Sequence, residues 1–133
     1  MPSSQFRGQI GFIISYLCYA PAVAKKKTGK TSTPQNIIDD TCYLGGRRRG
    51  AVLKEEVWDD AGQVVKYSLD YINPRICSRD HGRVLGYDNS HGHHHRRFMG
   101  TVGAFEFRSY QELVDRFQRE VEGLWRQEDD QNG

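Results

Sequence analysis

The sequence is short of cysteine, of net charge and of long apolar runs, and each shortage excludes a class of protein. Its 133 residues include three cysteines, Cys18, Cys42 and Cys77. These are too few and too far apart for a disulfide scaffold or a four-thiolate zinc site. No segment approaches the roughly 18 to 20 consecutive apolar residues that a membrane-spanning helix needs. The formal net charge of +2 does not by itself indicate a nucleic-acid-binding protein. We therefore expect a small cytoplasmic protein without a membrane partner.

Histidine is the residue whose distribution departs from an ordinary composition, because four of the five histidines lie within five residues. These four are His91, His93, His94 and His95. Charge is also segregated: residues 73–108 carry six Lys/Arg against three Asp/Glu, whereas residues 109–133 carry three against seven. A basic segment with titratable imidazoles suits a phosphate-bearing or anionic partner. A solvated loop beside a solvated helix is the alternative interpretation.

The first 46 residues have the character of a doubtful leader or flexible tail. Residues 10–24 form a short apolar run, interrupted by Pro21, which is similar to a weak secretory signal. We favour the interpretation that the start is assigned too far upstream and that Val23 is the true initiator. A native buried strand or helix is the third interpretation. Residues 25–36 are rich in Lys, Thr, Ser and Pro without periodicity, which predicts a tail or linker. A single α+β domain is expected over residues 47–133.

Alternating apolar residues predict about four strands in that domain. Residues 51–58 and 63–72 are the first two, and the Asp-Asp-Ala-Gly turn between them predicts a hairpin. Residues 83–87 predict a short third strand and residues 102–107 a fourth. Between these two strands, the polar segment 88–97 is expected to be a loop.

The last element has the most regular pattern. Ser109 and Glu112 form a capping box, and apolar residues then recur at steps of three and four up to Trp125. This spacing predicts an amphipathic helix with one apolar face. The expected fold class is therefore α+β: a small antiparallel sheet of about four strands, packed against a C-terminal amphipathic helix.

The histidine segment allows three chemical interpretations. In the first, imidazoles act on RNA, since one can take a proton from a ribose 2′-hydroxyl while another group protonates the leaving oxygen. In the second, two of the histidines chelate zinc or a heavier divalent ion, with Asp88 as the nearest carboxylate. In the third, the rings cap strand ends and have only a structural role.

The first interpretation assigns a role to each polar residue of the segment. The residues expected to act in acid–base or phosphate chemistry are His91, His93, His94, His95 and Asp88. The residues expected to bind RNA or phosphate, or to orient the histidines, are Arg83, Arg96, Arg97, Asn89 and Tyr87. This chemistry needs no metal and no other cofactor.

The segment also resembles a known family. The pattern is similar to that of the TumE family: a short strand ends in residues 87–89, Ser90 and clustered His and Arg follow, and a capped helix begins after residues 105–107. These are small prokaryotic proteins assigned as toxins of toxin–antitoxin modules, often encoded beside a helix-turn-helix partner. The resemblance covers roughly residues 51–125. Many relatives have a proline-containing spacer between histidine pairs, whereas this chain has the compact segment 91–95, so the resemblance assigns no role to individual histidines.

The resemblance implies a toxin of a type II toxin–antitoxin module with a cognate antitoxin as its partner. Combined with the histidine chemistry, it predicts a metal-independent endoribonuclease. The alternative is a non-enzymatic module that binds a metal or a partner protein through the same histidine-rich loop, and a purely structural domain is a third hypothesis.

Overall fold

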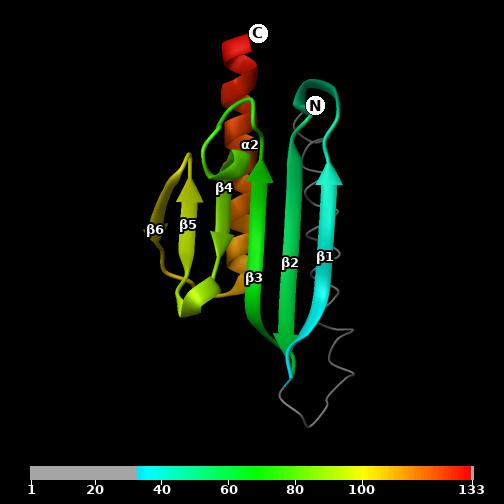
Figure 1. Ribbon diagram of the computed structural model, residues 1–133, viewed down its shortest axis with the longest axis vertical. Helices are drawn as coiled ribbons and strands as arrows, with labels where there is room; N and C mark the ends of the chain where they lie inside the picture. Colours follow the sequence, from blue (N-terminus) through cyan, green and yellow to red (C-terminus); the bar gives the residue numbers. More distant parts are fainter. Residues whose placement is uncertain (1–32, 133) are drawn as a thin grey trace.

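Six antiparallel strands lie in the sheet in the order in which they occur in the chain (Figure 1). The computed structural model describes residues 33–132. The strands are β1 (Gln35–Tyr43), β2 (Val52–Asp60), β3 (Gln63–Ile72), β4 (Arg83–Asp88), β5 (His95–Phe98) and β6 (Thr101–Ala104). One long helix, α2 (Tyr110–Asn132), follows the sheet. The predicted α+β class, with a sheet and a C-terminal helix, is confirmed.

The sheet has six strands rather than about four, and the two additional strands have polar sequences. The strand β5 reads His-Arg-Arg-Phe and lies inside the segment that was expected to be a loop. It pairs with β4 on one side and with β6 on the other. Backbone hydrogen bonding does not require apolar side chains, so a strand near a sheet edge can form without the alternation that reveals a strand in a sequence. The expectation of a loop over residues 88–97 was therefore wrong for residue 88, which ends β4, and for β5.

The sheet also begins before residue 47. The strand β1 pairs with β2 along its length, from Gln35 opposite Asp59 to Tyr43 opposite Val52. Ile38 on this strand is buried, with 2% of its surface exposed. Residues 35–43, which were grouped with the leader or tail, thus belong to the sheet. The expectations for residues 10–24 and for an initiator at Val23 lie outside the described residues.

The β2–β3 hairpin follows the sequence closely. Its turn has Ala61 and Gly62 at its centre, both with positive φ (55° and 85°). Two consecutive left-handed residues are the geometry of the tight turn that matches the twist of paired strands. The Asp-Asp-Ala-Gly signal therefore marks the turn correctly.

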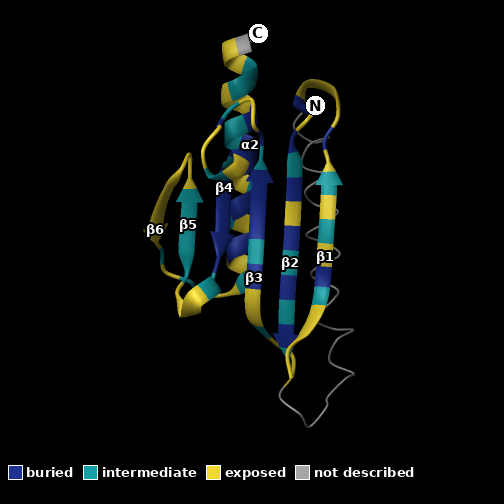
Figure 2. Cartoon of the chain, in the orientation of Figure 1, coloured by how far each residue is buried: buried dark blue, intermediate teal, exposed yellow. Residues whose placement is uncertain are grey.

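The helix α2 covers one face of the sheet, and Figure 2 shows that the buried residues concentrate where the two layers meet. The Ser109 hydroxyl accepts a hydrogen bond of 3.1 Å from the Glu112 amide, as the capping pattern predicts. The buried side of the helix presents Leu113, Val114, Phe117, Val121 and Trp125. Each large side chain buried in this way stabilises the fold by about 1.5–3 kcal/mol. None of the helices in residues 33–132 is both long and apolar enough to span a membrane.

An ion pair fixes the far end of the helix to the rest of the fold. Arg48 lies in a 3-10 turn (Gly46–Arg48) between β1 and β2, and only 1% of its surface is exposed. Its guanidinium donates two hydrogen bonds, of 2.8 and 3.1 Å, to the carboxylate of Asp129. It also lies 5.0 Å from the centre of the Trp125 ring. This contact joins the β1–β2 connection to the last turns of α2.

Candidate functional site

The strand β5 divides the histidine segment between the two faces of the sheet. In the β4–β5 pairing, His95 lies opposite Asp88 and Arg96 lies opposite Tyr87. Residues directly opposite each other on antiparallel strands project to the same face, and successive residues project to opposite faces. His95 and Asp88 therefore lie on the face away from α2, which we call the outer face. Arg96 and Tyr87 lie on the face covered by the helix.

On the outer face, Asp88 is the centre of a polar cluster. Its carboxylate accepts hydrogen bonds from the Ser90 hydroxyl (2.6 Å) and from Nε of Arg97 (3.0 Å). Burial alone would raise the pKa of Asp88, but the hydrogen bonds from Ser90 and Arg97 outweigh it and lower the pKa. Asp88 is consequently a carboxylate at neutral pH.

The imidazole of His95 faces this carboxylate. Its Nδ1 lies 3.8 Å from Oδ1 of Asp88, and 24% of its side chain is exposed. Nδ1 is buried and makes no hydrogen bond within the described residues. Hydrogen bonds of catalytic groups are often long before a ligand binds. A small movement would let Nδ1–H donate to Asp88, which would fix the tautomer and leave Nε2 on the solvent side.

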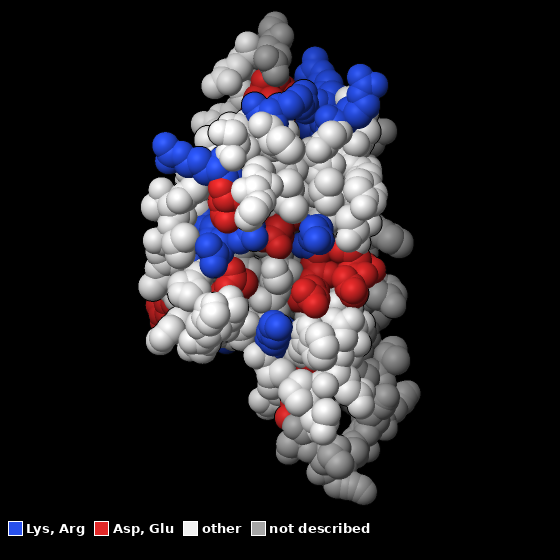
Figure 3. All heavy atoms as spheres, in the orientation of Figure 1, with Lys and Arg blue, Asp and Glu red and all other residues white. Residues whose placement is uncertain are grey.

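Arg83 extends the cluster toward the centre of the sheet. Its Nε lies 3.2 Å from the carboxylate of Asp70, and this pair lies over Gly86. A Cβ at Gly86 would come within 2.7 Å of both side chains, so only glycine leaves room for the pair. Because Gly86 pairs with Arg97 on β5, both arginines flank the same glycine. Figure 3 shows this face, where basic and acidic side chains alternate across the sheet.

Tyr87 and Arg96 instead connect the sheet to the helix. The Tyr87 hydroxyl donates to Glu120 on α2 (2.5 Å) and accepts from Nε of Arg96 (3.0 Å). Arg96 also donates to Glu120 at 2.9 Å. Burial, followed by the hydrogen bond to the Glu120 carboxylate, raises the pKa of Tyr87 to about 12. Both residues are therefore engaged within the fold rather than placed on the outer face.

His94 packs near the start of the helix. Its Nδ1 lies 2.7 Å from the Tyr67 hydroxyl, and its ring stacks on Phe107 with centroids 4.4 Å apart and an angle of 3°. Burial lowers the pKa of His94, and the nearby His95 lowers it further. This ring is thus held on the opposite side of β5 from His95.

Asn89 has a structural contact of its own. Its side-chain oxygen accepts from the backbone amide of Tyr67 (3.1 Å), and its side-chain nitrogen donates to the backbone carbonyl of Val65 (3.0 Å). These two bonds continue the pairing with β3 beyond the end of β4. Asn89 therefore positions the loop that follows β4.

The last two histidines are exposed. His91 has a positive φ of 62° in the 3-10 turn Ser90–Gly92. The ring of His93 lies 6.1 Å from that of His95. Since residues two apart in an extended chain project to the same side, His93 lies at the rim of the outer-face cluster.

The structure thus brings together half of the ten predicted site residues. Those on or beside the outer face, which we call the outer-face site, are Arg83, Asp88, His93, His95 and Arg97. His94, Arg96 and Tyr87 face the helix, and Asn89 holds a loop. His91 is exposed in the 3-10 turn. Within residues 33–132 no group of three or more His, Cys, Asp or Glu side chains is placed to hold a metal ion.

Sequence reasoning did not include two polar partners in this site. Ser90 follows Asp88 by two residues, and the Asp-x-Ser spacing is typical of a side-chain hydrogen bond to the backbone two residues later. Asp70 could have been placed by strand alternation, because residues 66, 68 and 70 share one face of a strand over residues 63–72. The position of its partner Arg83 could not be predicted in this way, because an irregularity in the β3–β4 pairing at residues 71 and 72 changes the register there.

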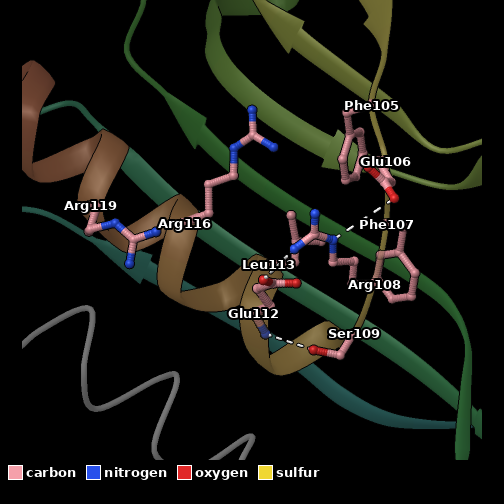
Figure 4. Close-up of a pocket in the computed structure, with 9 residues that line it drawn as sticks. All are labelled: Phe105, Glu106, Phe107, Arg108, Ser109, Glu112, Leu113, Arg116 and Arg119. Carbon is pink, nitrogen blue, oxygen red and sulfur yellow. Dashed lines mark hydrogen bonds and ion pairs between the residues drawn. The ribbon is translucent and has the colours of Figure 1, made fainter.

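A cavity on the helix side was also not foreseen (Figure 4). It has a volume of about 270 Å³ and is lined by residues 105–109 and the first turns of α2. Its lining contains Arg108, Arg116 and Arg119. These arginines are far from the histidines in sequence, and nothing in their spacing indicates a cavity.

Comparison with family models, with curated proteins and with solved structures finds no match for this chain. Its function must therefore be inferred from the chemistry of the outer-face site.

Proposed function

We propose that this chain is the toxin of a toxin–antitoxin module and acts on RNA as a metal-independent endoribonuclease through the outer-face site. The observation that carries the proposal is the position of His95: its Nδ1, which makes no hydrogen bond in the described residues, lies 3.8 Å from the Asp88 carboxylate, beside Arg97. A histidine oriented by a carboxylate and flanked by arginines suits proton transfer at a phosphodiester. The antiparallel sheet holds these side chains on neighbouring strands, so their spacing is rigid.

In the proposed reaction, His95 is the general base. It removes the proton from a ribose 2′-hydroxyl, and the 2′-oxygen attacks the adjacent phosphorus. The new bond joins the 2′-oxygen to phosphorus, and the bond from phosphorus to the 5′-oxygen breaks, leaving a 2′,3′-cyclic phosphate. His93 donates the proton that the 5′-oxygen needs as it leaves. Its ring centre is 6.1 Å from that of His95, so the edges of the two imidazoles can contact one phosphate that lies across them.

The arginines of the site would bind and stabilise the phosphate. Arg97 uses Nε for Asp88, and its terminal nitrogens make no hydrogen bond within the described residues. Arg83 is held by Asp70 on the adjacent strand. Guanidinium groups that are held in place by carboxylates need little reorganisation to stabilise the charge that develops on a phosphorane.

The second candidate is a non-enzymatic module that binds its antitoxin through the same face. It is favoured by the pairing of both arginines with carboxylates, since paired charges on a sheet also suit protein recognition. The described part of the chain contains no group of three His, Cys, Asp or Glu side chains that could bind a metal, so the metal-binding form of this alternative has no structural support.

The full chain should be expressed from an inducible promoter in a bacterial host, and then purified and incubated with total RNA in the presence of a chelator. We expect growth arrest that the antitoxin gene relieves, and RNA fragments that end in 2′,3′-cyclic phosphate. His95→Gln should lower cleavage by about 100-fold or more, the contribution of a general base. His81→Asn is the matched control, because His81 is an exposed histidine outside the site.

Cleavage that persists unchanged in His95→Gln would contradict the proposal. Growth arrest without any RNA cleavage would also contradict it, and would favour the binding module.

A further inference from the structure

The cavity at the start of α2 lies on the other side of the sheet from the outer-face site. It is bounded by the connection from β6, residues 105–109, and by helix residues Glu112, Leu113, Arg116 and Arg119. Figure 4 shows these side chains around one hollow, with the arginines coming from both the connection and the helix. A volume of about 270 Å³ is just below the range of about 300–1,000 Å³ for small-molecule sites.

The polar lining of this cavity has an excess of positive charge, with three arginines against the two carboxylates Glu106 and Glu112. Arg108 lies 3.9 Å from Glu106 and 3.6 Å from Glu112. All three of these side chains are more than half exposed, and such surface pairs contribute little to stability. An anion that enters the cavity can therefore compete for the guanidinium of Arg108.

The other two arginines differ in how firmly they are held. Arg116 lies over the rings of Tyr87 and Phe105, at 5.5 and 5.8 Å from their centres, and 3.9 Å from Glu120. These contacts fix its direction. Arg119 is exposed and has no ion pair within residues 33–132. One positioned guanidinium and one guanidinium without an ion pair in the described residues thus line the same cavity, and each guanidinium can bind a phosphate through two parallel N–H···O bonds.

Aromatic rings complete the lining. Phe107 stacks on His94, with centroids 4.4 Å apart, and on Tyr67, with centroids 5.4 Å apart. Both Phe105 and Phe107 are only partly buried. A half-exposed ring supported from behind by other rings provides a surface on which a nucleobase can stack, and such stacking is worth about 1–3 kcal/mol per base.

We propose that this cavity binds a nucleotide, with the phosphate at Arg119, Arg116 and Arg108 and the base against Phe107. The same chemistry is offered by a free mononucleotide and by a terminal nucleotide of RNA. The proposal does not depend on ribonuclease activity, because none of these residues belongs to the outer-face site.

The test is isothermal titration calorimetry of the full chain with each of four ligands in turn. These are adenosine 5′-monophosphate, inorganic phosphate, adenosine and a short RNA with a 5′-phosphate. We expect the mononucleotide or the RNA to bind more tightly than either inorganic phosphate or adenosine alone. Arg119→Gln should weaken this binding by about tenfold, the loss of one charged hydrogen bond. Arg126→Gln is the matched control, since Arg126 is an exposed arginine of the same helix outside the cavity.

A second variant separates the base from the phosphate. Phe107→Leu should weaken nucleotide binding and leave the affinity for inorganic phosphate unchanged. Binding of RNA without binding of the mononucleotide would identify an RNA end as the ligand. Nucleotide affinity that is equal in the parent chain, Arg119→Gln and Arg108→Gln would overturn the proposal, and so would a nucleotide that binds no tighter than phosphate. If a His95→Gln chain that no longer cleaves RNA still binds the nucleotide, the cavity and the outer-face site act independently.

Discussion

Arg48 provides a sharp test of how the helix is attached to the sheet. The substitution Arg48→Met keeps most of the aliphatic volume over Trp125 and removes the charge. It leaves Asp129 without its two hydrogen bonds and Glu128 without a guanidinium 3.9 Å away. Breaking a buried ion pair by removing one partner costs about 3–5 kcal/mol. Asp129 is not left uncompensated, however, because 30% of its side chain is exposed to water and Arg47 lies 3.1 Å from its Oδ1 oxygen.

We therefore expect a cost below that range, about 1–2 kcal/mol, which is still a measurable part of the stability of a small domain. Urea denaturation followed by circular dichroism measures it, provided that the slope of the transition is unchanged. Arg49→Met is the matched control: Arg49 is the exposed neighbour, and its replacement should change stability by less than about 0.5 kcal/mol. An Arg48→Met chain within that limit would refute the view that this ion pair holds the end of α2.

Three further predictions concern the sheet. Burial raises the pKa of Glu55 from 4.5 to about 8, so the folded state keeps a proton that the unfolded state loses. The free energy of unfolding should therefore fall as the pH rises from 4.5 to 8. A pH series of unfolding curves should show that Glu55→Gln removes this fall. Gly86→Ala should destabilise by about 1–3 kcal/mol in a thermal melt by displacing the overlying charged pair, whereas Gly103→Ala, with nothing within 4 Å of its Cβ, should not. Tyr87→Phe should cost about 1–2 kcal/mol in urea unfolding, because it removes the hydroxyl between Glu120 and the sheet.

The fold was predictable from the sequence where side chains carry the signal. The helix α2 and the hairpin between β2 and β3 both have a regular apolar period and a specific cap or turn, and both were predicted within a few residues. The strands β1 and β5 were not predicted, because acidic or basic residues interrupt their apolar period. Their places come from backbone pairing with neighbouring strands, which a sequence pattern does not record.

The site was predictable as a segment but not as a geometry. Clustered histidines and arginines drew the prediction to residues 83–97, and five of the ten predicted residues lie on or beside the outer face. Once β5 is a strand, its period of two sends His95 and Arg97 to the outer face, and His94 and Arg96 toward the helix. The sequence shows the four histidines only as one cluster. The register of β4 and β5 is needed to assign each ring to a face of the sheet.

The most direct test of the central claim compares the two adjacent histidines that β5 places on opposite faces. The purified chain, His95→Gln and His94→Gln should be assayed side by side for RNA cleavage, with a chelator present and the fold of each variant checked by circular dichroism. We predict that His95→Gln lowers the rate by about 100-fold or more, while a folded His94→Gln chain cleaves at a rate close to that of the parent. Loss of cleavage in His94→Gln with an active His95→Gln chain would contradict the outer-face site.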